Sequence, residues 1–165
     1  MKRPLITAVV AVGQLALVAL AVAPQLSARL AGDTYLVRVA PVDPIDPFRG
    51  AYVALDYPDL RHGGSRSSVE PGLGALEDGE SGEVYIALAE TDGVWVGAEW
   101  TRTRPTHGPY LACDDRSWQV RCGIESWFLP QEDAREAEVL LREGAVAELR
   151  VDARGNAAVV DVRAR

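Results

Sequence analysis

The tract Pro41–Tyr57, PVDPIDPFRGAYVALDY, decides the fold. Its first half is rich in proline and aspartate, which favour turns with restricted backbone angles. Its second half alternates like a β-strand, in which successive side chains point to opposite faces. The two faces of that strand are Tyr52, Ala54 and Asp56 on one side and Val53, Leu55 and Tyr57 on the other. The tract therefore predicts a rigid turn that leads into a strand of a β domain.

An uncharged apolar run, residues 5–23 (LITAVVAVGQLALVALAVA), precedes this tract. As a helix it reaches roughly 28 Å, about the thickness of the hydrocarbon core of a bilayer. Lys2 and Arg3 precede the run and no acidic residue comes before Asp33, which favours a cytoplasmic N-terminus and an exported remainder. We therefore expect four segments: a cytoplasmic N-terminus at 1–4, a transmembrane anchor at 5–23, a linker at 24–32 and an extracytoplasmic domain at 33–165.

A cleaved secretory signal is the main alternative to this anchor. Ala21-Val22-Ala23 has the small-x-small form of a cleavage site, but Pro24 would follow the cut directly and disfavours it. The run is also longer than the apolar region of most signal peptides, about 7–15 residues. A buried helix of a soluble domain is a third interpretation, which the lack of a polar face disfavours. We favour an uncleaved anchor, with the bilayer as a partner through residues 5–23.

The charge is unevenly distributed along the chain, which has 17 Lys and Arg against 24 Asp and Glu. Without Lys2 and Arg3, 15 basic residues face the same 24 acidic ones, so the expected exported part carries about nine net negative charges. Such a domain is repelled by nucleic acid and by anionic lipid. Nucleic acid is therefore not an expected partner.

Cys113 and Cys122 flank the turn-like residues 114–117, and their flanking segments can pair as a hairpin. Opposite positions on neighbouring strands bring Cβ atoms close to disulfide range. In an oxidising compartment such a pair favours a disulfide. Two independent thiols and a metal site shared with His107 are the alternatives, and the metal site lacks further ligands nearby in the sequence.

The remaining pattern predicts more strands than helices. The expected strands are Thr34–Val39, Ala51–Tyr57, Glu83–Ala89, Val94–Trp100, the two cysteine flanks, Glu125–Leu129 (buried, or the exit of a buried strand), Val146–Val151 and Ala157–Val162. Residues 59–82 are expected to form a mobile loop and 101–109 a connection. Thr91-Asp92-Gly93 and Asp152–Asn156 are expected to be the turns of two hairpins. Pro130 opens a helix, QEDAREAEVLLREG, whose apolar stripe is Ala137, Leu140 and Leu141. The fold class is a mainly β domain, barrel or sandwich-like, with one packed helix, after a single transmembrane helix.

The order of these segments resembles the bacterial membrane-anchored proteins named for the GDYXXLXY motif. The motif here is Gly50, Ala51, Tyr52, Leu55 and Tyr57, with Ala51 where the family has Asp. The later stretches VYIALAETDGVW and GIESWFLPQEDAREAE follow in the family's order, which makes the resemblance more specific than the motif alone. The motif residues that we single out are Pro41, Asp43, Pro44, Asp46, Pro47, Arg49, Gly50, Tyr52, Leu55, Tyr57 and Glu125.

The resemblance implies a protein of the bacterial cell membrane without a cofactor. Members tend to be encoded beside multi-span membrane proteins, so the resemblance implies a non-catalytic accessory or binding partner of such a protein. The small residues Ala11, Gly13, Ala16 and Ala19 of the anchor are suited to packing on another helix.

The alternative function is a carboxylate-dependent envelope hydrolase acting on glycan. Asp46 and Glu125 could perform acid-base chemistry if their carboxylates lay about 5–9 Å apart. The structural interpretation is preferred, because Asp in proline-rich turns bonds its own backbone and Glu beside a helix start complements the helix dipole. Arg49 could pair with Asp46 or Glu125 and fix the start of the strand.

Other chemistries have weaker support in the sequence. A serine triad could use His62, Asp59 and one of Ser65, Ser67 and Ser68, and a thiol enzyme could use Cys113 or Cys122 with His107. A Ser-Lys dyad is excluded, because Lys2 is the only lysine. The spacing of Asp43, Asp46 and Asp56 does not match a known calcium loop. An aromatic binding face is the last candidate, as opposed to a core role for the same residues: Tyr52, Tyr57, Trp100, Trp118 and Trp127.

Overall fold

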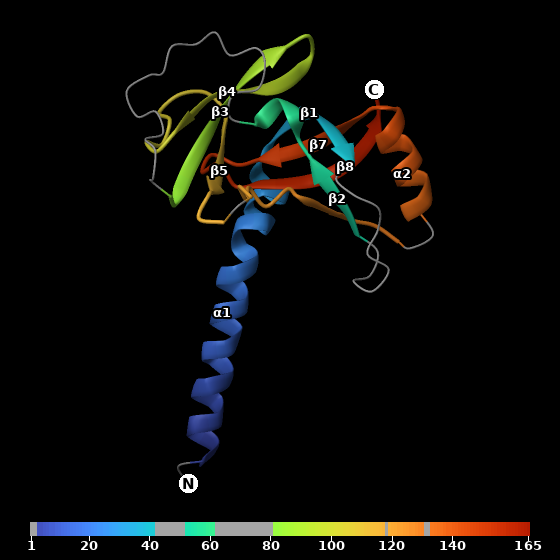
Figure 1. The fold of residues 1–165 in the computed structure, drawn as a ribbon. Helices are drawn as coiled ribbons and strands as arrows, with labels where there is room; N and C mark the ends of the chain where they lie inside the picture. The colour runs from blue at the N-terminus through green and yellow to red at the C-terminus, as the bar shows by residue number, and fades with distance from the viewer. Residues whose placement is uncertain (1–2, 42–51, 62–80, 118, 131–132) are drawn as a thin grey trace.

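The structure, a computed structural model, describes residues 3–41, 52–61, 81–117, 119–130 and 133–165. Helix α1 (Arg3–Ala31) projects from one side of a β domain, and the N-terminus lies at its far end (Figure 1). Within the described residues α1 contains one segment, Ile6–Ala31, that is long and apolar enough to cross a membrane. The predicted apolar helix is therefore present as one continuous element.

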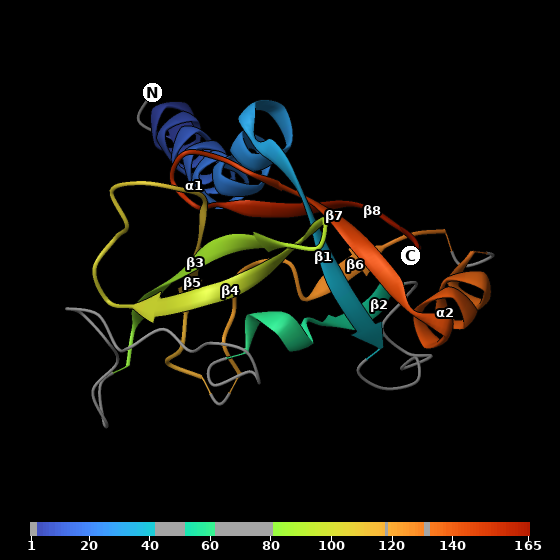
Figure 2. The same ribbon diagram turned by 90° about the horizontal axis from the view of Figure 1, so that it is seen from above.

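Eight strands form two antiparallel sheets. The first has the order β6-β2-β1-β7-β8 and the second the order β4-β3-β5. The strands are β1 (Asp33–Pro41), β2 (Tyr52–Asp56), β3 (Glu83–Thr91), β4 (Val94–Thr101), β5 (Tyr110–Asp114), β6 (Ser126–Phe128), β7 (Ala145–Val151) and β8 (Ala157–Ala164). Figure 2 shows the three-stranded sheet beside the five-stranded one. The predicted mainly β domain is confirmed, and its described sheets stay open instead of closing into a barrel.

Strand β1 holds the five-stranded sheet together by pairing on both sides. Residues 33–39 pair with β7, whereas Ala40 and Pro41 pair with β2. The β3–β4 hairpin turns at Asp92 and Gly93, which both have positive φ (53° and 77°), as two-residue hairpin turns require. The hairpin predicted from Thr91-Asp92-Gly93 is confirmed, and so is the final hairpin of β7 and β8.

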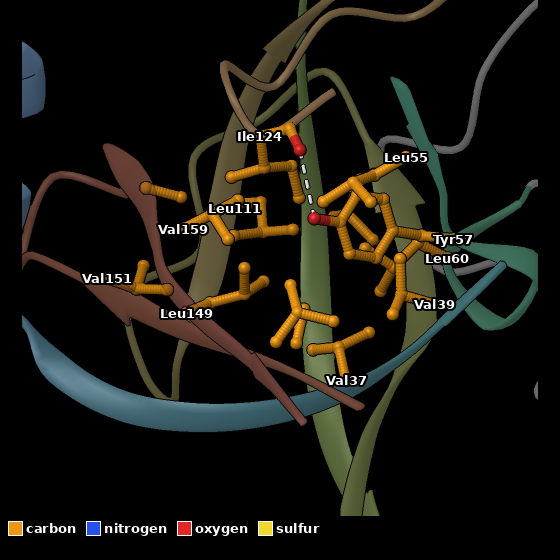
Figure 3. Packing of buried hydrophobic residues seen from close by; sticks show 14 of the residues in the cluster. Val37, Val39, Leu55, Tyr57, Leu60, Leu111, Ile124, Leu149, Val151 and Val159 are labelled. Carbon is orange, nitrogen blue, oxygen red and sulfur yellow. Dashed lines mark hydrogen bonds between the residues drawn. The ribbon is translucent and has the colours of Figure 1, made fainter. Parts of the chain in front are cut away.

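The hydrophobic core lies between the two sheets, which both contribute side chains to it. Figure 3 shows Val37 and Val39 of β1, Leu149 and Val151 of β7 and Leu111 of β5 among its members. The alternation predicted for β2 is confirmed, because Val53 and Leu55 are buried while Ala54 and Asp56 are partly exposed. Full burial of each such aliphatic side chain stabilises the fold by about 1.5–3 kcal/mol.

Helix α2 (Ala134–Glu143) covers one end of the five-stranded sheet (Figure 2). Of its predicted stripe, Ala137 and Leu141 are buried and Leu140 is partly buried. The helix begins four residues after Pro130, later than the sequence predicts. The Asp133 amide donates to the Pro130 carbonyl at 3.0 Å, and the first helical bond runs from the Ala137 amide to the Asp133 carbonyl. A separate turn at Pro130 therefore delays the helix.

Three further segments differ from the sequence-based expectation. Residues 24–31, expected to be a linker, continue α1 through Pro24. The start of the expected 59–82 loop is a short 3₁₀ helix, η1 (Pro58–Leu60), because Pro58 fixes a helical φ; residues 62–80 lie outside the described part. Strand β6 is an exposed edge strand and not a buried one, since Phe128 is 76% exposed.

Candidate functional site: the junction of the helix and the β domain

The last two turns of α1 dock against the β domain through side chains that recur at helical spacing. Gln25 donates from its amide nitrogen to the Gly123 carbonyl at 3.0 Å. Arg29 donates to the Val159 carbonyl of β8 at 3.1 Å, and Ala28 between them is fully buried. We call these contacts, with those of Ser27 and Gly32, the junction. It joins the helix rigidly to the domain, because it contacts β7, β8 and the loop before β6.

Asp152 lies at the centre of the junction, in the turn between β7 and β8. Its carboxylate accepts a hydrogen bond of 2.5 Å from the Ser27 hydroxyl. It also accepts bonds from the amides of Arg154 and Asn156 and from the Asn156 side chain, at 2.8 to 3.0 Å. Burial works to raise the pKa of Asp152, but these bonds outweigh it and hold the pKa below its ordinary value of 3.8.

The backbone at Gly32 completes the junction, because no side chain fits there. A Cβ atom at this position would lie 2.5 Å from the Ala28 carbonyl oxygen and 2.8 Å from the Val151 amide nitrogen. The Gly32 carbonyl accepts two bonds from the Arg150 guanidinium, at 3.0 and 2.8 Å. Helix and strand β7 therefore approach each other at backbone contact.

The family-motif strand β2 fastens the segment that carries Gly123. The Tyr57 hydroxyl, just after β2, donates to the buried Ile124 carbonyl at 2.9 Å (Figure 3). The Leu55 amide donates to the Glu125 carbonyl at 2.9 Å. The Tyr57 side chain and the Leu55 backbone thus hold residues 123–125 in the place where Gln25 of the helix reaches them.

Glu125 has a structural role in this arrangement. Its carboxylate accepts hydrogen bonds from the amides of Cys122, at 2.5 Å, and Gly123, at 3.1 and 3.2 Å. These bonds stabilise the tight turn at Gly123, whose φ is +80°. The carboxylate is thus bonded to the backbone of this turn, and not placed at the start of α2 as the sequence interpretation expected.

Many of the residues predicted from the sequence lie outside the described part of the chain. These residues are Asp43, Pro44, Asp46, Pro47, Arg49, Gly50, Ala51, His62, Ser65, Ser67, Ser68, Trp118 and Glu132, along with the side chains of Pro41 and Tyr52. The pair of Asp46 with Glu125, and the pairing of Arg49 with either of them, therefore also lie outside it.

The other candidate catalytic or metal-binding residues lie apart from one another or form ion pairs. His107 is exposed in the connection between β4 and β5, and Asp59 pairs with Arg38. Asp56 pairs with Arg61 at 2.5 Å. Among the described residues, no three His, Cys, Asp or Glu side chains gather as metal ligands would. The structure therefore brings no such cluster of metal ligands together in the part that it describes.

The three aromatic candidates from the sequence whose side chains the structure describes serve the core. Tyr57 is buried, and the Trp100 indole donates to the Leu60 carbonyl at 3.0 Å. Trp127 packs partly buried against the core. Of the two interpretations of these aromatics, the described residues thus fit the core role.

Cys113 and Cys122 form a disulfide, with Cα atoms 4.2 Å apart. Asp114 and Arg121 pair next to them with two hydrogen bonds of 2.8 Å, which places the cysteines directly opposite each other at the non-hydrogen-bonded position. The predicted pairing of the flanks is confirmed, although the loop between them is longer than the four-residue turn. The disulfide ties the loop before β6 to β5 in the other sheet.

A shallow groove of about 420 Å³ lies where the helix, β6 and β8 meet. Its lining consists of Gln25, Arg29, Gly123, Glu125, Ser126, Trp127, Phe128, Val159 and Val160. The groove therefore combines one cation, one carboxylate and an apolar wall directly beside the end of the apolar helix.

The junction residues Gln25, Ser27, Gly32 and Asp152 were not predicted from the sequence. One signal was available for the helix side, because polar and small residues after position 24 recur at helical spacing. The Asp-Ala-Arg-Gly-Asn turn of Asp152 was recognised only as a turn. The contact between Ser27 and Asp152 joins residues 125 positions apart, and no local pattern reports such a pair.

These features define a class of protein: a mainly β domain fixed rigidly to the end of one long apolar helix. The chain belongs to the GDYXXLXY protein family, whose model matches residues 14–162 and so includes more than half of the helix, the junction, strands β1 to β7 and most of β8. No curated protein and no solved structure matches the chain. The family name describes the motif that fastens the junction segment and specifies no reaction.

Proposed function

We propose that this protein is an uncleaved, single-pass anchor protein of the bacterial cell membrane that binds a multi-span membrane protein as an accessory subunit. Residues 5–23 span the bilayer, residues 1–4 are cytoplasmic and residues 33–165 form an extracytoplasmic domain. The observation that carries the proposal is a bilayer-length helix with a polar amide exposed at its midpoint.

Three features support the membrane topology. The small-x-small site at Ala21–Ala23 lies inside a continuous helix, whereas signal peptidases cleave extended chains. Basic residues and no acidic ones lie on the N-terminal side of the span. The disulfide of Cys113 and Cys122 fits an oxidising compartment on the other side.

Gln14 supports binding to a second membrane protein. It is the middle residue of the 5–23 run, and its side chain is exposed on the surface of α1. An amide in hydrocarbon is costly without a hydrogen-bond partner, and a neighbouring transmembrane helix commonly provides one. Of the small residues, Ala11 lies three positions before Gln14 on the same side of the helix, where it allows close approach of such a helix.

The rigid junction gives the accessory role a mechanical basis. A partner helix that packs on α1 fixes the helix, and the junction then fixes the β domain above the partner's extracytoplasmic face. A flexible linker would leave the domain free to rotate. The resemblance to proteins encoded beside multi-span membrane proteins agrees with this arrangement.

The test is a mild-detergent pull-down of the full-length protein from its native membranes, with mass spectrometry of the recovered proteins. We expect a multi-span protein at equal molar amount, and we expect Gln14→Leu to lower its recovery several-fold. Val12→Leu is the matched control, because Val12 is exposed on roughly the opposite side of the helix and should leave recovery unchanged. Recovery of the protein alone from native membranes would refute the accessory role.

A further inference from the structure

The contact between Gln25 and Gly123 fixes the height of the β domain above the membrane. Gln25 is two residues beyond the apolar run that ends at Ala23, which places it about 3 Å further along the helix axis. The headgroup layer on each side of a bilayer is roughly 5–8 Å thick. Since the Gln25 amide bonds the Gly123 carbonyl at 3.0 Å, Gly123 lies at the level of the headgroups when residues 5–23 span the hydrocarbon.

The segment Arg121–Phe128, which contains Gly123, runs along the side of the domain that faces the helix. Figure 1 shows this orange part of the chain at the lower edge of the domain, next to the end of α1. Phe128 and Trp127 line one groove with Gln25 and Arg29, so the far end of the segment also lies beside the helix. We call Arg121–Phe128 the membrane-level segment.

The exposed side chains of this segment are those that interfaces with lipid favour. Phe128 is 76% exposed, and outside α1 the only other large hydrophobic residue that the described part leaves so exposed is Val139, at 54%. Arg121 is exposed at the near end of the segment, and Arg29 is exposed on the neighbouring helix turn. Aromatic rings and arginine side chains are enriched where a protein contacts headgroups.

We infer that the membrane-level segment rests in the headgroup layer of the bilayer that α1 crosses, with the Phe128 ring inserted below the phosphates. The inference rests on the spanning helix of the proposed function, but it needs no partner protein. Arg121 faces the phosphates at a place where the rest of the domain is acidic and is repelled by anionic lipid. The domain thus sits against the membrane in one orientation, set by the junction and by this contact.

The test uses the full-length protein reconstituted into phosphatidylcholine vesicles that contain no other protein. Phe128→Cys is labelled with the fluorophore NBD, and Glu90→Cys is the matched control. Glu90 is exposed in β3, close to the β3–β4 turn at the end of the domain opposite to the helix (Figure 1). The native cysteines are bonded to each other, so only the introduced thiol reacts.

Lipid carrying a nitroxide on its headgroup should quench the fluorophore at position 128 at least three-fold more than at position 90. A second measurement avoids any attraction of the label to lipid: a membrane-impermeant charged thiol reagent should modify the unlabelled Phe128→Cys protein about ten-fold more slowly than Glu90→Cys. Equal quenching and equal reaction rates at the two positions would overturn the inference.

An alkaline carbonate wash of the vesicles separates this result from the proposed function. Protein that stays with the vesicles confirms the span, and the two measurements then decide on the membrane-level segment, whatever a pull-down finds. Protein released by the wash would overturn the anchor and this inference together. A failed pull-down with strong quenching at position 128 would refute only the accessory role.

Discussion

The Tyr57 hydroxyl and the Ile124 carbonyl are joined by a buried hydrogen bond of 2.9 Å, which connects the motif strand to the segment that meets the helix. Burial, and next the nearby negative charge of Glu125, raises the pKa of Tyr57 well above its ordinary value of 10. The hydroxyl is therefore a permanent donor at physiological pH. The final tyrosine of the motif thus acts as a structural donor in the core.

Replacement of Tyr57 by Phe should lower the free energy of unfolding by about 1–3 kcal/mol, because it leaves the Ile124 carbonyl buried without a donor. Urea denaturation of the full-length protein in detergent micelles measures the change. Tyr35→Phe is the matched control: Tyr35 is half-buried, and its ring, which Phe retains, contacts Trp95 edge to face. Equal stability of wild type and Tyr57→Phe would show that the bond contributes nothing.

The disulfide should make a measurable contribution to stability. Cys113 and Cys122 are nine positions apart, and the loop-entropy relation gives about 2–3 kcal/mol for closing a loop of this size. We expect reductant to lower the free energy of unfolding of the wild type by that amount. The double variant Cys113→Ala, Cys122→Ala should already be destabilised and should no longer respond to reductant. A wild type that reacts fully with a thiol reagent before unfolding would contradict the bond.

Stability should fall in acid because one partly buried carboxylate, Asp115, and one buried carboxylate, Asp152, are charged in the fold. The Arg102 guanidinium, bonded at 2.7 and 3.0 Å, chiefly holds the pKa of Asp115 below its ordinary value of 3.8. At Asp152 burial raises the pKa, but the hydrogen bonds to the carboxylate lower it by more, so this pKa also lies below 3.8. A lowered folded-state pKa means that the unfolded state binds more protons, so the stabilisation is complete above about pH 5 and is lost as pH falls below 3.8.

The variant Asp152→Asn tests how much of this loss of stability in acid comes from the Asp152 carboxylate of the junction. We expect the variant to be less stable than wild type at pH 7 and to lose less stability between pH 5 and pH 2, with each pKa unit worth about 1.4 kcal/mol. Glu136→Gln is the control, because it removes a carboxylate that is exposed on α2. Parallel stability curves for wild type and Asp152→Asn across this pH range would refute the argument.

The sequence predicted the elements that depend on local patterns. The alternation of Val53, Leu55 and Tyr57 specified the buried face of β2. Asp92-Gly93 specified the β3–β4 hairpin through positive φ. The opposition of Cys113 and Cys122 followed from pairing of their flanks. In each case the structure depends on residues that are close together in the chain, so the local sequence pattern is enough to predict it.

The elements that the sequence did not predict depend on distant contacts. The helix continues through Pro24 to Ala31. A stretch this short is not stable as a helix by itself, and contacts with the β domain, such as the bond from Arg29 to β8, stabilise it. The apolar stretch Glu125–Leu129 was expected to be a buried strand or the exit of one, yet Phe128 within it is exposed. Its exposure results from β6 lying at the sheet edge, which is a property of the strand order.

Gly32→Ala should separate the helix from the β domain without preventing either from folding. The added Cβ would lie 2.5 Å from the Ala28 carbonyl oxygen and 2.8 Å from the Val151 amide, and both are backbone atoms that cannot rotate away. We expect a loss of about 1–3 kcal/mol in the free energy of unfolding and faster hydrogen exchange at the amides of residues 25–32. Gly13→Ala is the matched control on the same helix, since nothing lies within 4 Å of its added Cβ. If both variants exchange at the wild-type rate, the junction tolerates a side chain at Gly32 and the helix is not held at backbone contact.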